Sequence, residues 1–205
     1  MRYYSSLGYS LLFKLKPVSL VFLIVLGLCA AGDAHALSTG GLSFSITPIV
    51  GYERVQEIVP KPHTKDRLTY GARATAGLPI ISLEVEYTQG QSSEDFRPSP
   101  DLMTKDSAQN LKVGARTKIP LTSMIHAIGR AGVQATKDHH EETVGGVTTA
   151  VDQPIVYKPY AGVGFSVGLT PKIAATGEIV AVFNKWPDMS QNNYQTTVGV
   201  VISVP

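Results

Sequence analysis

Six charged residues, three arginines and three glutamates, carry the clearest chemical signal in this chain of 205 residues. Each lies on the polar face of a segment in which apolar and polar side chains alternate, and each falls near the middle of its segment. Three positive and three negative charges at one level predict a balanced ion-pair network, because an uncompensated buried charge costs about 3–5 kcal/mol. A turn centred near Pro79 would set Arg73 opposite Glu86 as a cross-strand pair. The six residues are Arg73, Glu84, Glu86, Arg116, Arg130 and Glu178.

A second cluster of reactive side chains, His139-His140-Glu141-Glu142, consists of residue types that bind zinc or copper. Adjacent residues in one loop rarely converge on one ion, so we expect a solvated charged tip and no metal site. The chain shows no nucleophile motif, no phosphate-binding loop and no cofactor motif, and we therefore expect no catalytic residue and no cofactor. An enzyme would need a Ser, a His and a carboxylate converging near the rim of the fold.

The elements that position the six charges are eight segments of strict alternation, the period of a two-faced β-strand. In residues 67–78 the apolar face and the polar face each match at six of six positions. The eight predicted strands are 42–53, 67–78, 81–89, 111–119, 125–136, 157–169, 173–184 and 194–204.

All the charges of these strands fall on one face, which decides what each face contacts. A charge on a lipid-facing position costs about 2–4 kcal/mol at the bilayer midplane, whereas a soluble barrel of the lipocalin type would carry its charges outside. The predicted strands are also close to the length of about 9–11 residues that crosses a bilayer at a tilt. The pattern therefore predicts lipid on the apolar face.

The connections between the predicted strands alternate between long and short. Outer-membrane barrels show this asymmetry, with short periplasmic turns and longer extracellular loops. The two longest loops, Gln91–Asn110 and Lys137–Ile155, are polar. We predict an all-β fold, an eight-stranded antiparallel up-and-down transmembrane barrel with both termini in the periplasm.

A barrel of eight strands is just wide enough for its own side chains to fill. We therefore interpret the six charges as a plug and expect no continuous water channel. The alternative is a small gated pore, in which ions pass through the charged network.

The first 36 residues have the pattern of a secretory signal peptide. Arg2, Lys14 and Lys16 precede an apolar run, and Ala34-His35-Ala36 supplies a cleavage site. Without this leader, the 18 basic and 16 acidic residues of the chain become 15 of each, so the mature part is formally neutral and nothing suggests nucleic-acid binding. We predict a signal peptide over 1–36 and one domain, the barrel, over 37–205.

The residues also resemble a family. Pro159-Tyr160-Ala161-Gly162-Val163-Gly164-Phe165, followed by a short turn and Ala175-Thr176-Gly177-Glu178, resembles strands six and seven of the barrels related to outer membrane protein A. Thr47-Pro48-Ile49-Val50-Gly51-Tyr52 resembles their first strand. The resemblance spans Leu42 to Val204 and implies an eight-stranded outer-membrane barrel. Two features depart from it: we expect no peptidoglycan-binding domain after the barrel, and the chain ends Val204-Pro205 instead of on an aromatic residue.

Function is expected in the loops, because both faces of the barrel wall are occupied, one by lipid and one by matched charges. We predict a structural or surface-interaction role, such as adhesion or capture of an extracellular protein partner, and no enzymatic activity. The alternatives are the small gated pore and an outer-leaflet lipid-modifying enzyme. The other expected partners are outer-membrane lipid, lipopolysaccharide and the barrel-insertion machinery.

Overall fold

The computed structural model describes residues 42–57, 63–78, 80–95, 102–144, 147–184 and 191–204, all of them within one unit, Gly41–Pro205. The signal peptide expected over residues 1–36 lies outside the described residues and stays a prediction. No helix in the described ranges is long and apolar enough to cross a membrane.

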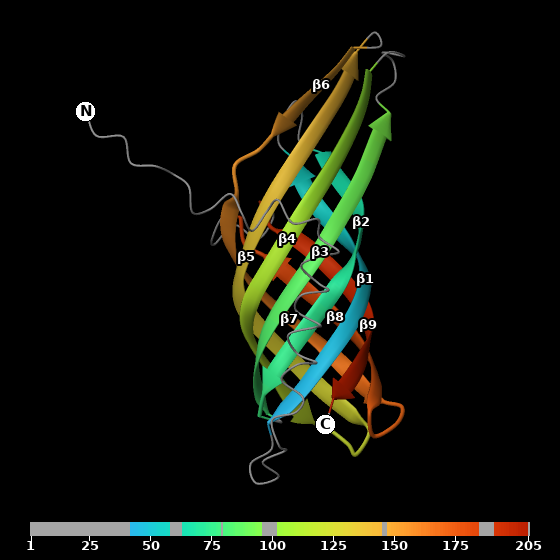
Figure 1. Ribbon diagram of the computed structural model, residues 1–205, viewed down its shortest axis with the longest axis vertical. Helices are drawn as coiled ribbons and strands as arrows, with labels where there is room; N and C mark the ends of the chain where they lie inside the picture. Colours follow the sequence, from blue (N-terminus) through green and yellow to red (C-terminus); the bar gives the residue numbers. More distant parts are fainter. Residues whose placement is uncertain are drawn as a thin grey trace, which may run out of the picture. The chain divides into compact units, whose positions relative to one another are not determined.

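Nine antiparallel strands account for nearly all of the described chain (Figure 1). They are β1 (Ser43–Glu57), β2 (His63–Gly77), β3 (Ile81–Asp95), β4 (Leu102–Pro120), β5 (Ile125–Val144), β6 (Val147–Asp152), β7 (Val156–Gly168), β8 (Ile173–Val182) and β9 (Asn193–Val204).

Eight of these strands form a closed ring. Each pairs with its neighbour along the chain, except that β5 pairs with β7, and β1 closes the ring by pairing with β9. The ninth strand, β6, stands outside the ring and pairs with the far part of β5. The predicted closed barrel of eight antiparallel strands is confirmed, and β6 is an addition that the sequence did not indicate.

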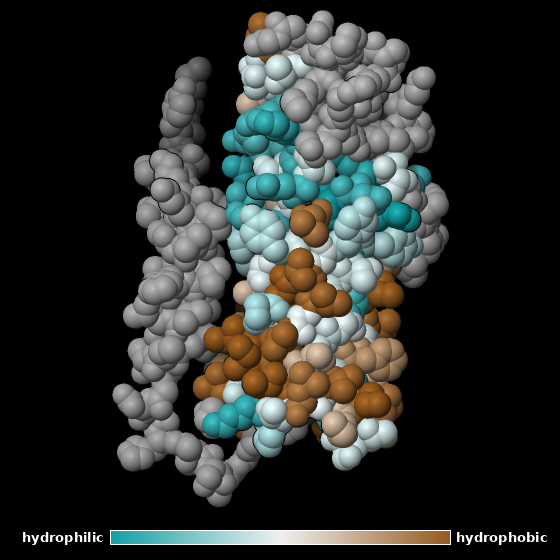
Figure 2. Space-filling model, turned by 90° about the vertical axis from the view of Figure 1, so that its right-hand side faces the viewer, coloured by the Kyte–Doolittle hydropathy of each residue, from teal (hydrophilic) through white to brown (hydrophobic). Residues whose placement is uncertain are grey.

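The outer surface of the ring carries a belt of exposed apolar side chains. Val85, Val113 and Val133, which lie side by side on β3, β4 and β5, are 40%, 54% and 49% exposed. Figure 2 shows hydrophobic residues gathered over the lower part of one face and hydrophilic residues above them. The alternate positions point inward and are polar, so the interior is the charged side, as predicted.

The two ends of the ring differ. At one end, here called the short-turn end, the connections comprise residues 78–80, 121–124 and 169–172. Two of these turns use the same device, because Thr122 Oγ1 accepts a hydrogen bond from the Ile125 amide and Thr170 Oγ1 accepts one from the Ile173 amide, both at 3.0 Å. A threonine hydroxyl that satisfies a nearby amide is a common way to hold a tight turn.

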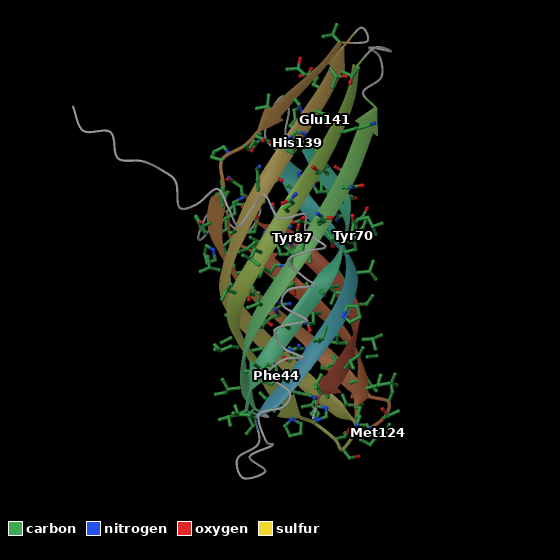
Figure 3. All side chains as sticks on the ribbon, in the orientation of Figure 1. Phe44, Tyr70, Tyr87, Met124, His139 and Glu141 are labelled. Carbon is green, nitrogen blue, oxygen red and sulfur yellow. The ribbon has the colours of Figure 1, made fainter. Side chains whose placement is uncertain are left out.

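At the opposite end, here called the extended end, β3, β4 and β5 project from the ring (Figure 1) and remain paired well beyond the belt residues Val85, Val113 and Val133. β4 has 19 residues and β5 has 20, about twice the 9–11 residues that cross a bilayer at a tilt. In Figure 3, His139 and Glu141 lie on this projection, Tyr70 and Tyr87 lie near mid-height, and Phe44 and Met124 lie towards the short-turn end.

The prediction of two long loops was wrong. Within Gln91–Asn110, β3 and β4 remain paired as far as Asp95 opposite Met103. Within Lys137–Ile155, β5 continues to Val144 and forms a hairpin with β6. The error has a physical reason: beyond the apolar belt the outward-facing side chains contact water and can be polar, as the inward-facing ones already are, so the alternation of apolar and polar residues disappears although the strand does not.

The exposure of Val113 gives the first test. Val113→Arg should lower the free energy of unfolding in lipid vesicles by about 2–4 kcal/mol, because it places a cation at the middle of the apolar belt. Val147→Arg, an equally large change at a 70% exposed position of β6, should leave the free energy almost unchanged. Urea titration measures the free energy of unfolding of both variants, and heat-modifiable migration on a gel identifies the folded protein. Equal stability of the two variants would mean that lipid does not surround the belt.

Candidate functional site

The interior of the barrel is built around Glu178 of β8, which is 2% exposed. Three guanidinium groups converge on its carboxylate. Arg73 Nη1 and Arg116 Nη2 donate to Oε1 at 2.6 and 2.9 Å, and Arg130 Nη1 donates to Oε2 at 2.8 Å. Thr176 Oγ1 donates to the same carboxylate at 3.0 Å.

The two glutamates of β3 complete this layer. Glu86 accepts hydrogen bonds from Arg73 Nε at 2.8 Å and from Arg130 Nη2 at 2.9 Å. Strand pairing sets Arg73 directly opposite Glu86, as the turn near Pro79 predicted. Glu84 accepts from Arg130 Nε at 2.8 Å. The structure thus brings together all six residues that the sequence singled out, and each is at most 7% exposed.

Tyr160 of β7, which the sequence did not single out, is also part of the layer. Its hydroxyl donates to Glu84 at 2.6 Å, and its ring centroid lies 5.3 Å from the Arg130 guanidinium carbon, within the range of a cation–π contact. The ring fits because β4 has a glycine beside it: a Cβ added at Gly114 would lie 2.4 Å from the Tyr160 hydroxyl.

Lys112 extends the network towards the extended end. Its ammonium donates to Glu86 Oε1 at 2.6 Å and also to Gln195, which in turn donates to Glu53 Oε1 at 2.6 Å. Its place on the polar face was visible in the sequence. Its partner was not, because a presumed loop of twenty residues between β3 and β4 left the pairing of Lys112 with Glu86 undetermined.

Two further layers occupy the interior above the network. The nearer one is neutral: Gln134 and Thr136 both bond to the Asn110 side-chain oxygen, at 3.0 and 2.8 Å. The next is charged again. Lys65 and His140 both contact Asp106, and Arg67 Nη1 lies 3.0 Å from Asp138. Lys65, Asp106, Asp138 and His140 were expected in connections between strands, so the sequence did not reveal them as part of the interior. Arg67 was expected on the polar face of its strand, but its partner Asp138 was not.

At the extended end, the cluster His139-His140-Glu141-Glu142 is divided between the two faces of β5. Alternation along a strand places His139 and Glu141 on one side and His140 and Glu142 on the other. Among the described residues there is no group of three His, Cys, Asp or Glu side chains that could hold a metal ion. His139 instead pairs with β6, where its Nδ1 lies 2.5 Å from Asp152 Oδ1.

Ser107, His139 and Asp152, which lie side by side on β4, β5 and β6, bear on the alternative of an outer-leaflet enzyme. Strand pairing places Ser107 beside His139 and His139 beside Asp152, and Ser107 and His139 line one surface cavity of about 440 Å³. A hydrolytic triad needs the Nε2 nitrogen of the histidine to take a proton from the serine. Here Nε2 faces Glu141 Oε1 at 3.3 Å, and no hydrogen bond joins Ser107 to His139 in the described part of the chain. The arrangement holds β6 against β5 and lacks the geometry of a triad.

The fold and its charged interior define a class, the small closed antiparallel barrel of the outer-membrane type. No protein-family model and no curated protein sequence matches the chain. Solved structures do match in fold. Neisserial surface protein A is 11% identical, with a TM-score of 0.57 over 79% of this chain and 98% of its own. The attachment invasion locus protein Ail of Yersinia pestis is 7% identical, with a TM-score of 0.54 over 81% of this chain and 100% of its own.

The N-terminal barrel domain of OprF from Pseudomonas aeruginosa is 12% identical, with a TM-score of 0.54 over 81% of this chain and 100% of its own. The predicted resemblance to small barrels of the outer membrane protein A type is thereby confirmed at the level of the fold. Identities this low show a shared architecture and leave the activity of the chain to be argued from its own residues.

The convergence of three arginines on Glu178 gives the second test. Glu178→Gln should lower the free energy of unfolding by about 3–5 kcal/mol, because it keeps the size of the side chain but leaves buried guanidinium charge uncompensated. Glu142→Gln, the same change at an exposed position of β5, should alter it by less than about 0.5 kcal/mol. Urea titration in vesicles measures both, and equal effects of the two substitutions would contradict the central role of Glu178.

The third test concerns His139, which lies outside the apolar belt. Hydrogen bonds to Asp152 and Glu141 raise the pKa of His139 above 6.5, and His139 lowers the pKa of Asp152 below 3.8. The pair is therefore fully charged between these two ordinary values. The contribution of this ion pair to the attachment of β6 is lost as the pH rises through the raised pKa of His139, or falls through the lowered pKa of Asp152.

Amide hydrogen exchange in Val147–Asp152, corrected for the intrinsic effect of pH, should accordingly be slowest near pH 5 to 6 and should become faster in alkali. The variant His139→Gln should show no such dependence on the alkaline side. Protection that rises steadily with pH in the native protein would show that this ion pair does not hold β6.

Proposed function

We propose that this chain is an integral outer-membrane barrel, sealed by its interior charges, that captures an extracellular partner through its extended end. In this proposal residues 1–36 are a cleaved signal peptide, both termini of the mature chain lie in the periplasm, and the extended end faces outward. Lipopolysaccharide then surrounds the outer part of the apolar belt, and the barrel-insertion machinery places the chain in the membrane. The observation that carries the surface role is the open edge of β6.

β6 pairs on one side only, with β5, among the described residues. All six of its residues are exposed. An edge strand presents a row of unpaired backbone donors and acceptors, which is a template for pairing with another chain. A barrel normally removes such edges by closure, so an open strand that projects from a closed ring supports a role in binding.

The register of the hairpin identifies the free backbone groups. The Gln153 amide donates to the Asp138 carbonyl at 3.0 Å. Because hydrogen-bonded pairs alternate along an antiparallel ladder, residues 149 and 151 direct their amides at β5, whereas Thr148, Ala150 and Asp152 direct theirs away from it. A partner strand beside β6 would bond to these three residues.

The chemistry of the edge favours an extended polypeptide as the partner. Addition of a strand to an open edge draws its affinity from main-chain hydrogen bonds and its selectivity from alternate side chains. Val147 and Val151 share one face of β6 and are 70% and 53% exposed, so they can contact apolar side chains of the partner. The Ail crystal structure holds a heparin analogue, sucrose octasulfate. A glycan has no peptide backbone with which to continue the ladder of β6, so the open edge favours a polypeptide here.

The alternatives have less support. For a pore, ions would have to cross a layer in which guanidinium and carboxylate groups lie within 3 Å of one another and are almost completely buried. For an outer-leaflet enzyme, His139 would have to leave Glu141 and turn towards Ser107. We therefore propose a non-enzymatic protein whose interior is closed by its ion-pair network.

The fourth test uses the free amide of Ala150. Ala150→Pro removes this donor without affecting the pairing of β6 with β5, whereas Ala150→Val keeps the donor and favours a strand. Non-adherent bacteria that display the protein should adhere to plates coated with extracellular-matrix proteins. The proline variant should reduce adherence about tenfold, a loss of about 1.4 kcal/mol, and the valine variant should retain it.

Both variants must remain heat-modifiable, which shows that the barrel is folded. If the proline variant adhered as well as the native protein, the β6 edge would not be the binding surface. If the native protein did not adhere at all, a purely structural role would replace the interaction role.

A further inference from the structure

The interior of the barrel contains a cavity of about 230 Å³ between the ion-pair network and the short-turn end. Neither the network nor the proposed function accounts for it. Its lining comes from β1, β2, β3, β4, β7 and β9 and reaches the rim of the barrel, where β1 begins and β9 ends. The lining residues are Ser43, Phe44, Ser45, Thr75, Leu78, Ser82, Arg116, Lys118, Ser166, Val201 and Ser203.

Hydroxyl groups form most of the polar wall of this cavity. Ser45 Oγ and Thr75 Oγ1 lie 2.6 Å apart, so one of the two donates to the other. Ser82 Oγ lies at the distance limit of a hydrogen bond, 3.4 Å from the Arg116 carbonyl. A hydroxyl hydrogen can rotate to suit a new partner. These side chains can therefore turn their donors towards an acceptor placed in the cavity.

The charged groups of the wall are both cationic. Arg116 is 7% exposed, and although its Nη2 bonds to Glu178, its Nε has no hydrogen-bond partner. Lys118 lies two residues further along β4 and therefore points to the same side. No Asp or Glu is among the described residues that line the cavity. The carboxylate that Arg116 contacts, that of Glu178, also accepts hydrogen bonds from Arg73 and Arg130.

A buried donor without a hydrogen-bond partner lowers the stability of the fold, and a buried cation without a counter-charge lowers it further. An anion in the cavity would satisfy Arg116 Nε, balance the charge of Lys118 and accept from the surrounding hydroxyls. The other charged layers of this interior are matched in sign. This end of the lumen is the exception, because its wall adds Lys118 to an Arg116 that is already paired with Glu178, and its described lining residues supply hydroxyl groups but no carboxylate.

We propose that this cavity is a binding site for a phosphate group, either free inorganic phosphate or the headgroup phosphate of a lipid in the adjoining leaflet. Phosphate offers several acceptor oxygens in a tetrahedral arrangement, which suits donors that converge from several strands. The volume of about 230 Å³ corresponds to roughly seven water molecules, enough for a phosphate and a few waters. Phe44 and Leu78 at the rim are exposed apolar residues that would border a lipid chain.

The experiment uses the purified mature protein in a non-ionic, phosphate-free detergent, titrated with inorganic phosphate. Backbone amide signals of Ser45, Thr75 and Ser166 should shift in a saturable manner. Lys118→Gln should weaken binding about tenfold, which corresponds to about 1.4 kcal/mol. Lys172→Gln removes the same charge at the same end of the barrel, from a residue that is not in the lining, and should leave the affinity unchanged. Heat-modifiable migration verifies the fold of each variant.

A second arm distinguishes the two sources of phosphate. In nanodiscs that contain phosphatidylglycerol, a lipid occupant would shift the same amide signals before any phosphate is added and would abolish the response to added phosphate. A persistent response would identify free phosphate as the ligand. The absence of saturable shifts in both arms would overturn the proposal, as would an equal loss of affinity in Lys172→Gln, which would indicate attraction to general positive charge.

Discussion

The pairing of β1 with β9 closes the sheet, and the rest of the structure depends on this closure. Once the ring is closed, its backbone groups are satisfied by neighbouring strands and its outer surface can be apolar all the way round. The same closure confines every inward-facing side chain of eight strands to a space that is only as wide as those side chains. Arg73 and Glu178, which are 105 residues apart in the chain, come within 2.6 Å for this reason.

Confinement explains why the interior is arranged in layers. A charge that enters such a space must find an opposite charge at its own height, because water cannot solvate it there. Glu178 and Glu86 satisfy this condition by sharing Arg73 and Arg130, and Lys65 satisfies it with Asp106 nearer the extended end. The short-turn end, where Lys118 and Arg116 line the cavity of about 230 Å³, satisfies it least.

The extended end follows a different constraint. Beyond the apolar belt the strands are held by their ladders and by polar contacts such as His139 with Asp152. Among the described residues this region has no hydrophobic layer like the belt, so its stability comes from continuous pairing of β3, β4 and β5. The short strand β6 adds one further ladder and ends the projecting sheet with an unpaired edge. A rigid ring that carries a projecting, open-edged sheet separates the part that provides stability from the part that is free to bind.

The sequence by itself determined the eight membrane-length segments, the face that each turns inward and the six charges at mid-height. It could do so because the apolar belt imposes a period of two on every strand that crosses it. A three-residue connection between β2 and β3 also determined the pairing of Arg73 with Glu86. Only the tertiary structure decided the course of the segments in which apolar and polar residues do not alternate. Where the outward face of a strand meets water, as at Ser107 or Glu141, its side chains are polar like those of the inward face, and nothing in the residue pattern separates a strand from a loop. Where the connection is long, as before Lys112, pairing is set by closure of the whole ring.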